Sequence, residues 1–332
     1  MYYNEQYFSG NIKELMMKVY FNHNFWSREN SDVSGIPKLT DWKFTHDGTE
    51  YFIPKIYQFQ EGITLDLINI LDNEKLMAFY DKYAPVEHEM DAEEIAIAEH
   101  EKPIPELHLK GVFINGHPTE VSSSSVCRVS FLDKKMDATE FLNEIKKEYN
   151  ISNEESFQFI RIHAKYTDEA QKEMSQLRFL MANTEELIPV RKRFIVENTV
   201  EESQYDVIFQ HPLTGEEHHL YMASEFKDAR NTFPHYDRTE PHNFVILEYE
   251  LVPPLPKDEH IAIQEIRQMD INDGNAAAIG FIFSDKKTGI HGYAMEHDFS
   301  SMYWKELDYA EFSIVGIKKV KCNEGEIEVL HQ

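Results

Sequence analysis

Cysteine is scarce in this sequence: Cys127 and Cys322 are the two that occur among 332 residues, and they form no CxxC pattern. A disulfide framework is thereby excluded, and a cysteine-based zinc site is not expected. The first residues lack the basic and apolar regions of a secretory signal, and no apolar run approaches the roughly 18 residues that a membrane-spanning helix needs. We therefore expect a cytoplasmic protein without a membrane partner.

Basic residues are also few. Lysine and arginine together number 33, against 59 aspartate and glutamate residues, which gives a net charge of −26. Such a charge repels phosphate backbones and anionic lipid headgroups, so nucleic acids and membrane surfaces are poor partners. It favours cations and basic partners. We expect a protein partner or a small-molecule ligand, whose identity the sequence does not specify.

Strong catalytic motifs are missing as well: the sequence has no P-loop, no G-x-G-x-x-G, no H-E-x-x-H and no G-x-S-x-G. The first hypothesis is accordingly a non-catalytic binding or protein-interaction protein on a β-rich scaffold. The alternative is a divalent-metal-dependent hydrolase with histidine and carboxylate ligands gathered from several loops. Converging histidine and carboxylate side chains in a structure would favour the alternative.

The length of the chain exceeds the size at which one hydrophobic core stops growing, which predicts two domains. Residues 1–150 mix helical and strand patterns and are expected to form an α+β domain. Residues 151–332 carry many short alternating runs between turn residues and are expected to form a mainly antiparallel β domain, similar to a β-sandwich. The predicted fold class is α+β with a β-rich chain.

Local patterns give the predicted elements of the first half. The alternation in 63–71 predicts a strand, and the apolar spacing in 9–20 and 138–149 predicts helices. Asp91 with Glu94 resembles a capping box, which favours a short exposed helix in the acidic segment 86–102. The four serines 122–125 are expected in a polar loop between strands.

In the second half, residues 168–182 place apolar side chains at helical spacing, although a strand after a loop is also compatible with LRFLMA. We expect a helix there. Hairpins are predicted with turns near 212–216, 285–289 and 323–326, the last two within 277–296 and 312–330.

Four segments carry a resemblance to other proteins: EYFIPKIYQFQEGITLDLINILD with EKLMAFYDKY, and HPLTGEEHHLY with NFVILEYELVPPLP. They resemble an uncharacterised protein family of anaerobic clostridia, a group with no assigned activity. The resemblance covers much of residues 50–256 and implies a bacterial cytoplasmic setting. It implies no chemistry, so no functional residue can be carried over from it.

Histidines are the most specific candidates for a site. With Thr214 and Gly215 as a two-residue turn, His211 would lie opposite His218, with Cβ atoms about 4.5–5.5 Å apart. Two imidazoles at that spacing can share a transition metal. The candidate metal ligands are His211, His218, His235 and His242, and Asp237 or Glu240 could also supply the third ligand. His219 would point to the opposite face, and an exposed polar hairpin end is the simpler interpretation.

The acidic segment offers a second candidate. His88 and His100 stand among seven carboxylates between residues 87 and 101. Paired carboxylates can serve acid–base or metal chemistry, and a solvated helix face accounts for the same residues. Both interpretations remain open from the sequence.

Overall fold

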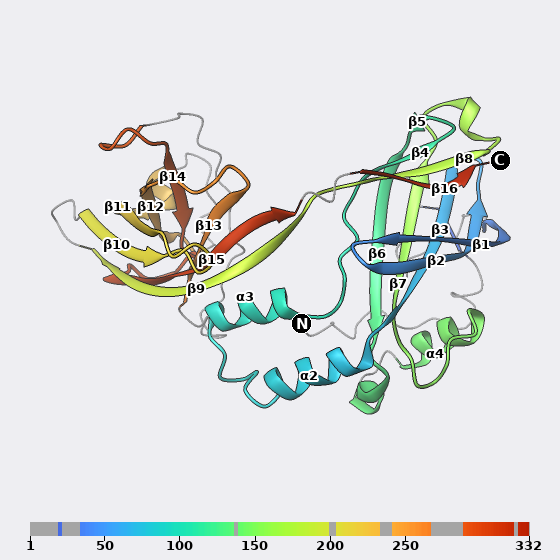
Figure 1. Ribbon diagram of the computed structural model, residues 1–332, viewed down its shortest axis with the longest axis horizontal. Coiled ribbons are helices and arrows are strands. Elements are labelled where there is room, and N and C mark those ends of the chain that lie inside the picture. Colours follow the sequence, from blue (N-terminus) through green and yellow to red (C-terminus); the bar gives the residue numbers. More distant parts are fainter. Residues whose placement is uncertain are drawn as a thin grey trace. The chain divides into compact units, whose positions relative to one another are not determined.

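The protein is described from a computed structural model (Figure 1). The structure describes residues 19–21, 34–135, 139–198, 204–232, 241–266, 288–321 and 325–331. Strands predominate in these ranges and pair antiparallel, so the chain is β-rich, as the sequence predicts. No helix of the described residues is long and apolar enough to cross a membrane.

Contacts between residues divide the chain into two compact units. Unit 1 comprises Met1–Asp81, Pro103–Thr184 and Cys322–Gln332, and unit 2 comprises Lys82–Lys102 and Glu185–Lys321. The boundary expected at residue 150 falls inside unit 1. The physical reason is that the strand after residue 150 occupies the middle of the first sheet, where it pairs with a strand before it.

The strands described in unit 1 form two sheets. The first has the order β1-β2-β3-β7-β6, with the strands β1 (Ile36–His46), β2 (Thr49–Gln58), β3 (Gly62–Leu71), β7 (Ser156–Lys165) and β6 (Glu120–Arg128). The second has the order β16-β8-β4-β5, with β16 (Gly325–His331), β8 (Gln176–Met181), β4 (Leu109–Ile114) and β5 (His117–Pro118).

Both sheets of unit 1 contribute to one hydrophobic cluster. Leu65 and Leu67 on β3 are buried together with Val112 on β4 and Phe179 on β8. The predicted strand 63–71 is thus confirmed as β3. Its alternate side chains face two directions because side chains of a strand alternate between the faces of a sheet.

Among the described residues, unit 1 contains the helices α2 (Asn73–Tyr83), whose last two residues belong to unit 2, and α4 (Thr139–Glu148). It also contains two 3₁₀ turns, η2 (Ser130–Lys135) and η3 (Glu169–Gln171). Leu142 and Ile145 of α4 are buried against Phe157 and Phe159 of β7. The helix predicted over 138–149 is therefore confirmed, while its expected N-cap Asp137 lies outside the described residues.

The strands described in unit 2 also form two sheets. One has the order β10-β11-β12-β14, with β10 (Gln204–Gln210), β11 (Glu217–Asp228), β12 (Asn243–Val252) and β14 (Met295–Phe299). The other has the order β13-β15-β9, with β13 (Glu259–Glu265), β15 (Tyr309–Lys321) and β9 (Thr184–Glu197). Leu220 on β11, Leu247 on β12 and Phe312 on β15 belong to one buried cluster.

The described part of unit 2 contains two helices, α3 (Ala92–Glu101) and the short α5 (Ala229–Thr232). Asp91 accepts a hydrogen bond from the Glu94 backbone N–H, and the Glu94 side chain accepts one from the Asp91 backbone. The capping box read from the sequence is confirmed. The expected exposure of this helix is only partly right, because Glu93, Ile97 and Ala98 are buried.

Three predictions about secondary structure are wrong. Residues 168–182 form η3 and then β8, because alternate side chains of β8 are buried and the strand pairs with β4 and β16. The serines 122–125 lie within β6, paired with β7. The segments 309–321 and 325–331 form no hairpin with each other, since β15 pairs in a sheet of unit 2 and β16 pairs in a sheet of unit 1. Most of the predicted hairpin 277–296 lies outside the described residues.

Candidate functional site

The hairpin formed by β10 and β11 is present, but its register differs from the prediction. Phe209 lies opposite His218, and the His211 backbone N–H donates to the Glu216 carbonyl, so four residues form the turn. Gly215 has a φ of +74°, a conformation that glycine adopts without strain. Because the register is displaced by two residues, His211 and His218 remain on the same face of the hairpin without lying directly opposite each other.

The rings of His211 and His218 are both buried, with centroids 6.3 Å apart. The His211 Nδ1 atom accepts hydrogen bonds from the Leu213 and Thr214 backbone N–H groups at 3.1 and 3.4 Å. The neutral ring therefore carries its proton on Nε2, which donates to Glu259 at 3.0 Å. Both nitrogens of His211 are thus engaged, and a metal could bind only by displacing one of these partners.

His218 donates from Nδ1 to the Pro253 carbonyl oxygen at 2.8 Å, and its buried Nε2 has no hydrogen-bond partner among the residues that the structure describes. A histidine oriented by a backbone carbonyl is suited to metal binding through the other nitrogen, yet a site needs further ligands. His219 points to the other face, as expected, with Nδ1 3.0 Å from Asp206.

The other predicted ligands do not join this pair. His242 precedes the first residue of β12, whereas His219 lies opposite Val252 at its last residue. Ten strand residues at about 3.3 Å each separate the two ends by about 30 Å. His235, Asp237 and Glu240 lie outside the described residues. Among the residues that the structure describes, no group of three or more histidine, cysteine or acidic side chains is arranged to hold a metal ion, so the metal site stays a prediction.

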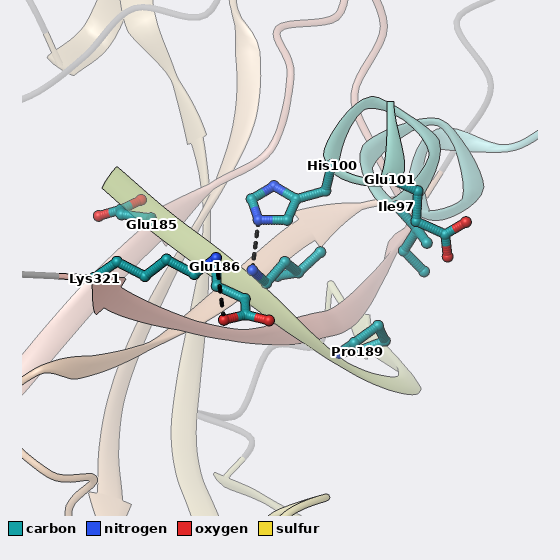
Figure 2. Close-up of a pocket in the computed structure, with 8 residues that line it drawn as sticks. Ile97, His100, Glu101, Glu185, Glu186, Pro189 and Lys321 are labelled. Carbon is teal, nitrogen blue, oxygen red and sulfur yellow. Dashed lines mark hydrogen bonds and ion pairs between the residues drawn. The ribbon is translucent and has the colours of Figure 1, made fainter. Parts of the chain in front are cut away.

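The second candidate from the sequence, His100 in the acidic segment, lies in a pocket of unit 2. The pocket encloses about 290 Å³ between the last turn of α3, the first residues of β9 and the end of β15. Its lining residues are Ile97, His100, Glu101, Glu185, Glu186, Leu187, Pro189 and Lys321. Figure 2 shows His100 reaching from α3 toward β9, with Lys321 on the side of Glu186.

The position of α3 beside β9 is fixed at both ends of the helix. At the first turn, Arg193 of β9 donates to Asp91 at 2.6 Å and to Glu93 at 3.2 Å. Glu93 also accepts from the hydroxyl of Ser313 on β15. At the last turn, the His100 Nε2 accepts a hydrogen bond from the Leu187 backbone N–H. A neutral His100 consequently carries its proton on Nδ1.

One side of the pocket is apolar. Ile97 of α3 is buried. On β9, Leu187 and Pro189 lie on either side of Ile188, whose side chain belongs to the buried cluster of unit 2. The alternation of the strand turns Leu187 and Pro189 away from the core that Ile188 joins. These two side chains are therefore available to a ligand at the pocket.

The other side of the pocket carries three carboxylates, one held by hydrogen bonds and two in longer ion pairs. Glu101 accepts hydrogen bonds from Lys82 and from the Tyr83 hydroxyl, and the bond from Lys82 lowers the pKa of Glu101, so it is ionised at neutral pH. Glu185 lies 3.6 Å from Lys318 and 3.7 Å from His260, and Glu186 lies 3.5 Å from Lys321. These longer pairs are exposed, and such pairs contribute about 0–1 kcal/mol.

No family model, no curated protein and no solved structure matches the chain. The function of the candidate site is therefore inferred from its geometry.

Sequence reasoning pointed to His100 and Glu101 only as members of an acidic segment. It did not point to Glu185, Glu186 or Lys321. Nothing local connects these residues with α3, because at least 84 positions along the chain separate them from its last residue, Glu101. The pair Glu185 and Glu186 at the start of a strand was the available signal, although exposed acidic pairs are common at such positions.

Proposed function

We propose that the protein is a non-catalytic binding protein, and that its pocket between α3 and β9 receives a cationic group on an aliphatic stem. An arginine or lysine side chain of a partner, or a small organic cation of that shape, fits this description. The observation that carries the proposal is the division of the pocket into the apolar residues Leu187 and Pro189 and the carboxylates Glu185 and Glu186.

Arginine and lysine bury their methylene groups on apolar surfaces while their charged heads remain near polar groups. The stem would lie against Leu187 and Pro189, and the head would reach Glu185. Because the pairs of Glu185 with Lys318 and His260 are long and exposed, a ligand cation can replace them at low cost. The Nδ1–H of His100 is a donor for a carbonyl group of the ligand.

The net charge of −26 supports this ligand class, since an acidic protein attracts cations over a distance. It also supports the expectation that nucleic acids are not partners. A salt-sensitive shift of DNA or RNA at micromolar protein would contradict this expectation. We also propose that the two sheets of each unit form a sandwich-like pair, which the clusters shared between the sheets support.

The proposal is tested by calorimetric titration with N-acetylarginine methylamide and with its citrulline counterpart, which has the same shape but no charge. We expect the arginine compound to bind with a Kd near 1 mM or tighter and the citrulline compound to bind at least tenfold more weakly. One factor of ten corresponds to about 1.4 kcal/mol.

Two variants localise the binding. Glu185→Gln removes one charge from the pocket and should weaken the arginine compound about tenfold. Glu225→Gln removes the same charge from β11, where Glu225 is exposed and pairs with Lys227, and should leave the affinity within twofold. Equal binding of the two compounds, or an equal effect of the two variants, would refute the proposal.

A further inference from the structure

The sheet β10-β11-β12-β14 has a face that does not belong to the pocket. Even-numbered residues of β11, such as Leu220 and Met222, are buried, and the odd-numbered residues His219 and Tyr221 face the other way. Tyr221 lies opposite Asp206 of β10 and opposite Glu250 of β12. We name as the β11 face the side chains Asp206, Ile208, His219, Tyr221, His291 and Tyr293.

Three rings of the β11 face form a column. His219 stacks on Tyr221 with centroids 5.5 Å apart, and Tyr221 stacks on His291 with centroids 4.2 Å apart. Asp206 holds His219 from one side. The column is therefore built from two separate segments, since two of its rings belong to β11 and the third belongs to the turn that precedes β14.

The buried Glu250 fixes that turn. Its carboxylate accepts hydrogen bonds from the backbone and Nδ1 of His291, each at 3.0 Å, and from the Tyr293 backbone N–H at 2.7 Å. A side chain at Gly289 would collide with the Glu250 carboxylate, since a Cβ there would lie 2.3 Å from it. The rings are thus held in place before any partner arrives, which lowers the entropy cost of binding.

Apolar side chains remain exposed beside this column. Ile208 is 42% exposed, Tyr293 is 39% exposed, and Ile290 in the same turn is 81% exposed. Aromatic side chains such as tyrosine are enriched at the centre of protein interfaces. Single exposed apolar residues need no explanation, but these lie around one ordered column.

The charges around the column are mostly negative. Asp206, Glu217 and Glu248 lie on the same face of the three strands, and the nearby Lys227 pairs with Glu225. His297 lies 3.2 Å from Glu248. With neutral histidines the face therefore carries excess negative charge, which is complementary to a basic partner.

We propose that the β11 face is a docking surface for a basic protein segment that also carries apolar side chains. The apolar side chains of the segment would cover Ile208 and Tyr293, and its cations would approach Asp206 and Glu248. This inference does not depend on the pocket between α3 and β9.

The test uses fluorescence anisotropy with a labelled twelve-residue peptide containing four arginines and three leucines, titrated with the full chain. The double variant Ile208→Ser with Tyr293→Ser should weaken binding at least tenfold. The matched control is Ile195→Ser with Tyr309→Ser, which removes an isoleucine and a tyrosine that are also exposed in unit 2. It should stay within twofold, and thermal unfolding should show both double variants folded.

A second arm separates this surface from the pocket. Glu185→Gln should leave the peptide affinity within twofold, whereas Asp206→Asn with Glu248→Gln should weaken it about fivefold. If Glu185→Gln weakens the peptide and the face variants do not, the peptide binds the pocket and this proposal is wrong. Equal losses of peptide affinity in the face variant and in its control would also overturn it.

Discussion

Asp66 on β3 and Arg161 on β7 form a buried ion pair with two hydrogen bonds, Nε to Oδ1 at 2.7 Å and Nη2 to Oδ2 at 3.0 Å. Tyr149 directly follows the last residue of α4, and its hydroxyl also donates a hydrogen bond to Asp66. Burial raises the pKa of Tyr149, and the Asp66 carboxylate raises it further, so the phenol keeps its proton. The pair connects two neighbouring strands of the first sheet and ties the end of α4 to them.

We predict that Arg161→Met destabilises the protein by about 3–5 kcal/mol, because Asp66 is left as a buried charge without its cation. Lys165→Met on the same strand removes an exposed partner of Glu120 and should cost less than about 1 kcal/mol. Urea unfolding of both variants measures the difference. The double variant Asp66→Leu with Arg161→Met should recover most of the loss, and similar losses in both single variants would show that the pair is unimportant.

Asp298 on β14 is predicted to make stability depend on pH. Burial raises the pKa of Asp298 to about 6, and the neighbouring charge of Glu296 contributes, although Asp298 accepts a hydrogen bond from the Tyr249 hydroxyl at 3.1 Å. In the unfolded chain the group loses its proton near pH 4. Between about pH 4 and 6 the folded state binds more protons, so the contribution of this group to stability falls as pH rises through that window.

Asp298→Asn keeps an acceptor for Tyr249 and is never charged. Compared with the natural chain, it should be more stable by about 1–3 kcal/mol at pH 7.5 and equally stable near pH 4. Thermal unfolding of both proteins at the two pH values tests this. A variant that is stabilised equally at both values would mean that burial of the charge is not the cause.

Gly316 on β15 is predicted to set the distance to β9. A Cβ at this position would lie 2.5 Å from the Ile188 carbonyl oxygen and 2.7 Å from the Leu187 side chain. Gly316→Ala should therefore cost about 1–3 kcal/mol, as overpacking does, and should weaken ligand binding, because Leu187 lines the pocket. A Cβ at Gly325 would meet no atom of the described residues within 4 Å, so Gly325→Ala is the matched control. Urea unfolding and ligand titration of both variants test this. Equal stability and equal ligand affinity of the two variants would contradict the prediction.

Local signals in the sequence were sufficient where an element is specified by its own residues. Asp91 and Glu94 mark the start of α3, and the alternation of 63–71 marks β3. Local signals were insufficient where pairing with a distant segment of the chain decides between helix and strand. Leu177, Phe179 and Met181 suit a helix by spacing and a strand by alternation, and the neighbours β4 and β16 select the strand.

The same limit applies to the candidate sites. His211 and His218 share a face as the sequence suggested, but the register of one hairpin depends on the conformation of its turn, and a four-residue turn changed the partners. Glu185 and Lys321 approach His100 only because β9 and β15 are neighbours in one sheet and α3 packs beside them. No spacing in the sequence encodes that proximity.

The most direct test of the proposed pocket is NMR of the chain with isotope-labelled isoleucine and leucine methyl groups, titrated with N-acetylarginine methylamide. We predict saturable shifts of the methyl signals of Ile97 and Leu187, the residues that line the pocket, and unchanged signals for the buried Leu65 and Leu142 of unit 1. The citrulline compound should produce much smaller shifts. Unchanged Ile97 and Leu187 signals at ligand concentrations that shift other methyl groups would contradict the claim that this pocket binds a cation.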